Sequence, residues 1–372
     1  MKAVNLINQK RFFQRNQVFQ YFGIQKFSRN FSTSSNQDKD NTASNSNKLQ
    51  APQKESNEIN FIKNQNVKGA RAAHHKRDLD DQYSADNHTL LPYLYLYKVQ
   101  SKLPSTPTSQ QQIGYILMEP RTRHLMAVDL SGDFDANYQI INEIEKQNKS
   151  ELRYLISTKE TKLTEESIES KIKWKEQRPN LQIITSGQQL LNHPKLQTTH
   201  TLKDLQTLEL GDICICCLET PGHTQDSVSF VVTHVTLDST KIPFLFSGRS
   251  LEIGGCGNIL DGNPEQMFYS LQKLINLPNE TLLFTACDTA VQNLKFAKYI
   301  EPDNPMISHK LNQCQKALDN GDFSVPSKLM EEKLYNPFIR CARDEYFSQI
   351  TGEQDPIRIF AKIRKLRDTF DK

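Results

Sequence analysis

The chain has 372 residues, a formal net charge of +3 and a hydrophobic share of 37%. This length allows two domains, or one domain with extensions, and the low hydrophobic share indicates a folded part accompanied by polar segments. No run of about 18 apolar residues is present, so no transmembrane helix is predicted. The charge is too small to indicate a nucleic-acid partner. The seven cysteines are odd in number and scattered, which favours a reducing compartment.

Residues 1–35 carry basic side chains, among them Lys10, Arg11 and Arg15, and no acidic residue precedes Asp38. A stretch that is basic, amphipathic, free of acidic residues and rich in serine at its end is typical of a mitochondrial transit peptide. We therefore expect this segment to be removed, and the mature protein to lie in the matrix or on the matrix face of the inner membrane. The alternative is a basic arm that stays on the protein.

Residues 36–90 are rich in Asn, Gln, Ser and Lys and almost lack apolar side chains. Such a segment cannot bury enough surface to offset the entropy lost on ordering. The composition predicts a largely disordered linker, or an arm that wraps around a partner protein.

Regular structure is predicted from residue 91 onward, because the tyrosines and leucines of LPYLYLYKVQ alternate as in a half-buried strand. A helix is predicted over 136–146, where Ile140, Ile141 and Ile144 form an apolar stripe, and a second over 164–176. The other strands are expected at IGYILMEP, HLMAVDLS, RYLIST, LQIITSG, LQTLELGD, ICICCLET, SVSFVV and IPFLFSG. Strand-rich halves separated by helices indicate an α+β fold of two packed sheets with helices outside.

A glycine-rich stretch follows the last of these strands, since five of the 14 glycines fall between Gly248 and Gly262. Glycine at this density indicates backbone with positive φ, or backbone that approaches a neighbour too closely for a Cβ atom. The stretch is either tight structure or part of a binding site. It is not a phosphate-binding P-loop, because no Gly-Lys-Ser/Thr follows. A helix is predicted to begin at Asn263-Pro264-Glu265.

The glycine-rich LFSGRSLEIGGCGNILDGNPEQM, together with LETPGHTQDS, NLKFAKYIEP and YNPFIR, resembles glyoxalase II, the hydroxyacylglutathione hydrolase of the metallo-β-lactamase superfamily. The resemblance covers roughly residues 91–370. It implies an αββα sandwich over 91–265 and a helical domain over 266–372. It also implies a site in which two zinc, iron or manganese ions activate a bridging hydroxide that hydrolyses a glutathione thioester.

The ligand positions of that family are mostly changed in this chain. Of the seven ligands that the resemblance implies, His223 alone is kept, and the nine histidines include no H-x-H pair. The other six positions are occupied by Lys159, Thr161, Leu163, Thr164, Arg249 and Cys287. Because ammonium and guanidinium groups do not bind metals, the sequence predicts that no metal cofactor is bound.

A buried cation requires a partner of opposite charge. In the family, the strand end that carries Asp129 borders the site, so we expect Arg249 to pair with Asp129 inside the former metal site. The alternative places Arg249 outward on the surface.

The substrate side is changed as well. The positions that hold glutathione in the family correspond to Asn258, Leu260 and Thr289, while Arg364 and Arg367 keep basic character. The two arginines either retain some substrate binding or form a solvated helix face.

Three functions compatible with these residues remain open. The first is a catalytically inactive protein that serves as a subunit of a large mitochondrial assembly. The second is a module that still binds a thioester. The third is a hydrolase with rebuilt, metal-free chemistry, in which Cys287 is the nucleophile and His223 the base.

Overall fold

The structure of the chain, a computed structural model, describes residues 112–130, 134–159, 165–185, 201–234 and 242–370, and the backbone of three strands that precede them. The expected transit peptide lies outside the described residues. So does most of the expected polar arm, in which two short strands are assigned, β1 (Ile62–Lys63) and β2 (His75–Arg77).

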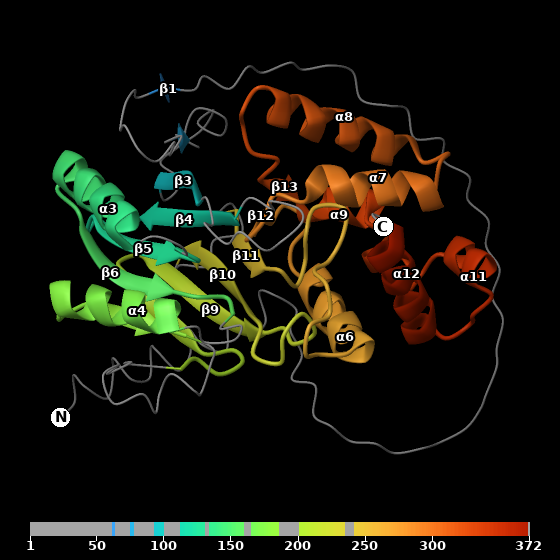
Figure 1. Cartoon of the computed structure of the whole chain (residues 1–372), viewed down its shortest axis with the longest axis horizontal. Helices are drawn as coiled ribbons and strands as arrows, with labels where there is room; N and C mark the ends of the chain where they lie inside the picture. Colours follow the sequence, from blue (N-terminus) through green and yellow to red (C-terminus); the bar gives the residue numbers. More distant parts are fainter. Residues whose placement is uncertain are drawn as a thin grey trace.

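Two sheets form the centre of the molecule (Figure 1). The first sheet has the order β1-β2-β3-β4-β5-β6-β7, with antiparallel pairs up to β5 and parallel pairs from β5 to β7. Beyond β2 its strands are β3 (Tyr93–Val99), β4 (Gln112–Met118), β5 (His124–Val128), β6 (Glu151–Ile156) and β7 (Gln182–Ile184).

The second sheet has the order β13-β12-β11-β10-β9-β8, and all of its pairs are antiparallel except β11 with β12. Its strands are β8 (Thr207–Leu210), β9 (Ile213–Glu219), β10 (Val228–His234), β11 (Phe244–Gly248), β12 (Leu282–Thr285) and β13 (Ser327–Lys328). The last two lie beyond the expected domain boundary at residue 265, so the sandwich and the helical region share this sheet.

Strand β4 shows how the sequence positions the two layers. Alternate side chains of a strand point to opposite faces. Tyr115 accordingly packs between the sheets, with its ring 5.3 Å from that of Phe246 and 5.5 Å from that of Phe284. Ile116 faces the other way, into a separate apolar cluster that includes Ile141 and Trp174 of the helices α3 (Phe134–Asn148) and α4 (Glu165–Gln177). The two predicted helices therefore cover the outer face of the first sheet.

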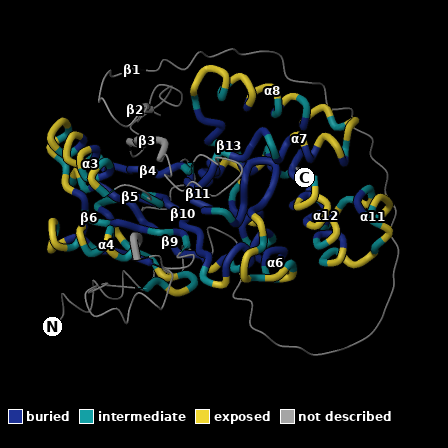
Figure 2. The backbone as a smooth tube through the Cα atoms, in the orientation of Figure 1, coloured by how far each residue is buried: buried dark blue, intermediate teal, exposed yellow. Residues whose placement is uncertain are grey.

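The C-terminal helices occupy the right-hand side of Figure 1 and belong to the same apolar cluster as the second sheet. They are α6 (Pro264–Ile275), α7 (Ala290–Ile300), α8 (Pro305–Asp319), α9 (Leu329–Tyr335), α10 (Pro337–Arg340), α11 (Glu345–Thr351) and α12 (Pro356–Phe370). Figure 2 shows the buried strands in dark blue between the exposed outer faces of these helices and of α3 and α4. The predicted α+β sandwich with a C-terminal helical region is confirmed.

Helix α6 begins where the sequence predicted. The side chain of Asn263 accepts a hydrogen bond from the backbone N–H of Gln266, whose own side chain bonds back to the backbone of Asn263. This capping box, with Pro264 in the first turn, satisfies N–H groups that have no partner within the helix. Among the described residues, no helix has the length and apolar character needed to span a bilayer.

Candidate functional site

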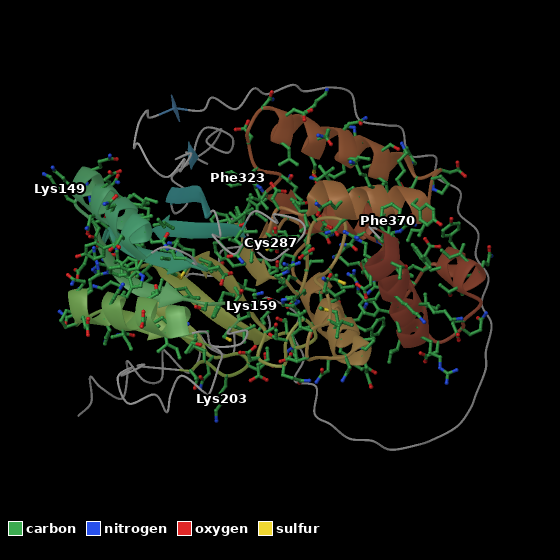
Figure 3. The ribbon with its side chains drawn as sticks, in the orientation of Figure 1. Lys149, Lys159, Lys203, Cys287, Phe323 and Phe370 are labelled. Atoms are coloured by element: carbon green, nitrogen blue, oxygen red, sulfur yellow. The ribbon has the colours of Figure 1, made fainter. Side chains whose placement is uncertain are left out.

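The residues singled out from the sequence meet where several strands end. Lys159 follows β6 of the first sheet, while His223 lies in the turn between β9 and β10 of the second. Arg249 and Cys287 follow β11 and β12, which run parallel, so their carboxyl ends lie side by side. Figure 3 labels Lys159 and Cys287 near the centre of the molecule, between the sheets and the C-terminal helices. The expectations for Thr161, Leu163 and Thr164 fall outside the described residues.

His223 is buried, and both of its ring nitrogens have defined partners. Its Nδ1 lies 2.6 Å from the backbone carbonyl oxygen of Asn258. A carbonyl can only accept, so Nδ1 carries the proton and Nε2 presents its lone pair. The Nζ atom of Lys159 lies 3.1 Å from Nε2 and donates to it.

The charges around this contact change the pKa values of both groups. Burial, followed by the nearby charges of Lys159 and Arg249, lowers the pKa of His223 to about 4. Burial also lowers the pKa of Lys159, and Arg249 lowers it further, although Asp129 and Glu252 partly oppose the change. His223 is therefore neutral at physiological pH.

Arg249 is held by Glu252, a residue that sequence reasoning missed. The Nε atom of Arg249 is in ionic contact with Oε1 of Glu252 at 3.2 Å, and the side chains are only 12% and 3% exposed. Its Nη1 donates to the Sγ atom of Cys287 at 3.4 Å. The outward orientation considered for Arg249 is thus wrong. Burial and a carboxylate partner are found, while the expected pair with Asp129 stays a prediction.

The carboxylate of Glu252 is buried and receives further hydrogen bonds. Its Oε2 atom accepts from Thr289 at 2.7 Å and from Asn293 at 3.0 Å. Burial acts to raise the pKa of Glu252, but Arg249 and these two donors outweigh it, so the pKa lies below its ordinary value. Thr289, which stands at a position where the family binds glutathione, therefore supports Glu252.

Asp129 binds the backbone that leads to Lys159. Its carboxylate accepts hydrogen bonds from the backbone N–H and the hydroxyl of Thr158, both at 2.8 Å. Asp129 itself has a positive φ of 54°, a conformation that aspartate tolerates better than most residues. This arrangement fixes the start of the loop that carries Lys159.

The glycine-rich stretch is tight structure around these side chains. At Gly248, φ is +59° and a Cβ atom would lie 2.4 Å from Oγ1 of Thr158. At Gly257 a Cβ atom would lie 2.4 Å from the backbone oxygen of Arg249 and 3.2 Å from Nδ1 of His223. Larger residues at either position would displace the site.

Arg364 and Arg367 on α12 point into the molecule. They are 3% and 8% exposed, so the solvated helix face is wrong. Arg364 donates to the backbone oxygen of Cys256 at 2.8 Å, and Arg367 donates to Oδ1 of Asn293 at 3.4 Å. Substrate binding by the two arginines stays a prediction.

The donor set does not fit a metal ion. The free lone pair of His223 faces an ammonium group, and the sulfur of Cys287 accepts from a guanidinium group. Within the part of the chain that the structure describes, no group of three or more His, Cys, Asp or Glu side chains could hold a metal.

The depressed pKa of His223 should make stability fall in mild acid. The pKa is 6.5 in the unfolded chain and about 4 in the folded one, so the stabilisation is complete above 6.5 and is lost as pH falls through 4. The melting temperature of the wild type should therefore decline more steeply between about pH 7 and pH 4 than that of His223→Gln. His309 on α8 supplies a control, because its side chain is exposed and lies on a different element. His309→Gln should keep the wild-type slope of melting temperature against pH. Equal slopes for the wild type and His223→Gln would refute the lowered pKa of His223.

The comparisons with known proteins agree with this fold. The family model of the hydroxyacylglutathione hydrolase C-terminus matches residues 288–370. A hydroxyacylglutathione hydrolase of Dictyostelium discoideum is 35% identical over 182 residues, which cover 46% of this chain and 68% of that protein. A hydroxyacylglutathione hydrolase-like protein of Gallus gallus is 37% identical over 175 residues, which cover 47% of this chain and 61% of that protein.

Among solved structures, a metallo-beta-lactamase from Staphylococcus aureus aligns over 74% of this chain and 71% of its own, with 19% identity and a TM-score of 0.47. The sequence relationship is the stronger of the two, because it exceeds 30% identity over two thirds of the Dictyostelium protein. The chain therefore belongs to the hydroxyacylglutathione hydrolase, or glyoxalase II, branch of the metallo-β-lactamase superfamily.

Proposed function

We propose that this protein is a catalytically inactive glyoxalase II-like protein of mitochondria that serves as a structural or accessory subunit of a large assembly, such as a respiratory complex of the inner membrane. One observation carries the inactive part of the proposal. The donor atoms at two of the former ligand positions, Nε2 of His223 and Sγ of Cys287, lie against cations of the chain itself. Without a metal-bound hydroxide, the family's route to thioester hydrolysis has no nucleophile.

The metal-free alternative requires Cys287 to be ionised and His223 to act as its base. Burial raises the pKa of Cys287, and the opposing effect of Arg249 is smaller, so the thiol stays protonated. Both ring nitrogens of His223 are engaged elsewhere, by Asn258 and Lys159. These contacts favour the inactive protein over the hydrolase.

The thioester-binding module is the second alternative, and the substrate side of the site argues against it. Thr289 is used by Glu252, while Arg364 and Arg367 bind groups of the chain itself. The scaffold is thus supported by side chains that a binding site would direct toward its ligand.

The mitochondrial part of the proposal is supported by the basic, acid-free residues 1–35. The role as a subunit is supported by the polar segment of residues 36–90, whose composition suits an arm that orders on a partner. A protein that keeps the packing of its family but lacks the catalytic site can act chiefly through surface contacts with other proteins.

A catalytically inactive protein should show no thioester hydrolysis. Purified protein should not hydrolyse S-lactoylglutathione faster than a heat-denatured sample of the same preparation. Turnover that a chelator abolishes would overturn the proposal in favour of metal chemistry. Turnover that resists a chelator and disappears in Cys287→Ser would establish the metal-free hydrolase instead.

Import into mitochondria predicts a processed N-terminus, and the role as a subunit predicts a partner. Tagged protein isolated from mitochondria should begin near residue 35 and should migrate on a native gel in an assembly much larger than its own chain, with the same subunits in repeated purifications. An intact Met1 would contradict the transit peptide. Migration as a single chain would contradict the role as a subunit.

A further inference from the structure

Two partly buried cationic side chains, those of Lys159 and Arg249, lie where segments of both sheets converge. Lys159 comes from the first sheet, and Arg249 from the second. Both lie beside His223: Nζ of Lys159 is 3.1 Å from its Nε2, and a Cβ atom at Gly257 would meet both Cβ of Arg249 at 3.1 Å and Nδ1 of His223 at 3.2 Å. The charge of Arg249 accordingly contributes to the lowered pKa of Lys159. Like charges at such a place repel, so their presence requires a compensating arrangement.

The compensation is present in the same cluster. Arg249 contacts the carboxylate of Glu252 at 3.2 Å. Glu252 and Asp129 both act on Lys159 in the favourable sense. The carboxylate of Asp129 lies at the start of the loop that carries Lys159, where it accepts hydrogen bonds from Thr158.

Each cation also joins segments that are distant in the sequence. The contact between Lys159 and His223 connects the loop after β6 of the first sheet to the turn after β9 of the second. The backbone N–H of Val228 donates to the backbone oxygen of Thr158 at 2.8 Å, next to this contact. Arg249 connects the end of β11 to the end of β12 through Cys287, while its ionic contact with Glu252 lies within the loop after β11.

We propose that Lys159 and Arg249 form an internal-cation centre, which performs the mechanical task of a metal cluster by tying the strand-end loops of the two sheets together without any bound ion. Lys159 binds His223 at the nitrogen that a metal would use, and Arg249 does the same at the sulfur of Cys287. The fold is therefore complete in the absence of metal, and added metal finds its donor atoms occupied.

The inference rests on the same contacts of Lys159 and Arg249 that support the proposed inactivity. Its test uses stability and metal content, whereas the proposed function is tested by turnover and partners. A stoichiometric metal would contradict both, whereas unchanged hydrogen exchange in Lys159→Met would contradict the internal-cation centre alone, and turnover without a metal would contradict the proposed inactivity alone.

The first measurement uses the unmodified chain. Protein purified from mitochondria should contain far less than one metal ion per chain by elemental analysis. Its melting temperature should be the same with a strong chelator and with a small excess of zinc. A stoichiometric metal, or a melting temperature that the chelator lowers, would overturn the internal-cation centre.

The second measurement uses Lys159→Met, which removes the charge and keeps much of the apolar stem. Its melting temperature should be lower than that of the wild type. Hydrogen exchange should become about tenfold faster at the turn around His223, because a hydrogen bond to a charged group is lost there. Lys310→Met is the matched control, since Lys310 is a buried lysine with a defined partner, Glu331 at 2.7 Å, but lies on α8.

Lys310→Met should leave exchange at the His223 turn at the wild-type rate. Unchanged exchange at that turn in Lys159→Met, or acceleration of equal size in both variants, would refute the role of Lys159. Should Lys159→Met fail to fold, the chelator and zinc measurements on the wild type decide the question alone.

Discussion

The carboxylate of Glu252 imposes the main constraint on this structure, because a buried charge must be matched by a counter-charge and by hydrogen-bond donors. Arg249 supplies the counter-charge, and Thr289 and Asn293 supply donors. Asn293 lies on α7 and accepts in turn from Arg367 of α12. Satisfying one carboxylate of the glycine-rich loop therefore requires the C-terminal helices to be in place.

A second buried carboxyl group, that of Glu332 on α9, binds the same loop from the other side. It accepts from the backbone N–H of Gly254 at 2.9 Å, and from the side chains of Tyr335 and Asn336 at 2.6 and 3.0 Å. Burial raises the pKa of Glu332, whereas Arg249 helps to lower that of Glu252. The glycine-rich loop is thus held by two buried carboxyl groups, one with a lowered pKa and one with a raised pKa. Neither set of contacts needs a metal. This separation of scaffold from chemistry explains how a member of the family can keep the fold with an altered site.

Much of the fold was predictable because its signals are local. The apolar stripe of α3 and the Asn-Pro-Glu start of α6 depend on residues within a turn or two of each other. The burial of Arg249 could also be predicted, from its place at the end of β11. Its partner could not, because Glu252 follows three residues later in a loop, where that spacing does not fix which side chains meet. The orientation of Arg364 and Arg367 depends on how α12 packs, which the sequence of α12 alone does not determine.

The contact between Lys159 and His223 was likewise beyond the sequence. The sequence analysis placed both residues at former ligand positions. The loss of the other ligands does not indicate, however, which group the remaining histidine faces. The contact arises because the carbonyl of Asn258 fixes the imidazole and leaves one nitrogen directed at the loop after β6.

A double-mutant cycle on Arg249 and Glu252 tests most directly whether charges of the chain itself hold the site. Arg249→Met and Glu252→Gln should each reduce the free energy of unfolding by about 3–5 kcal/mol, because each leaves one buried charge without its partner. The double variant removes both charges together, so its loss should be smaller than the sum of the single losses by at least about 1 kcal/mol. Losses that add within about 0.5 kcal/mol would show that the two side chains do not stabilise each other, and would contradict the account.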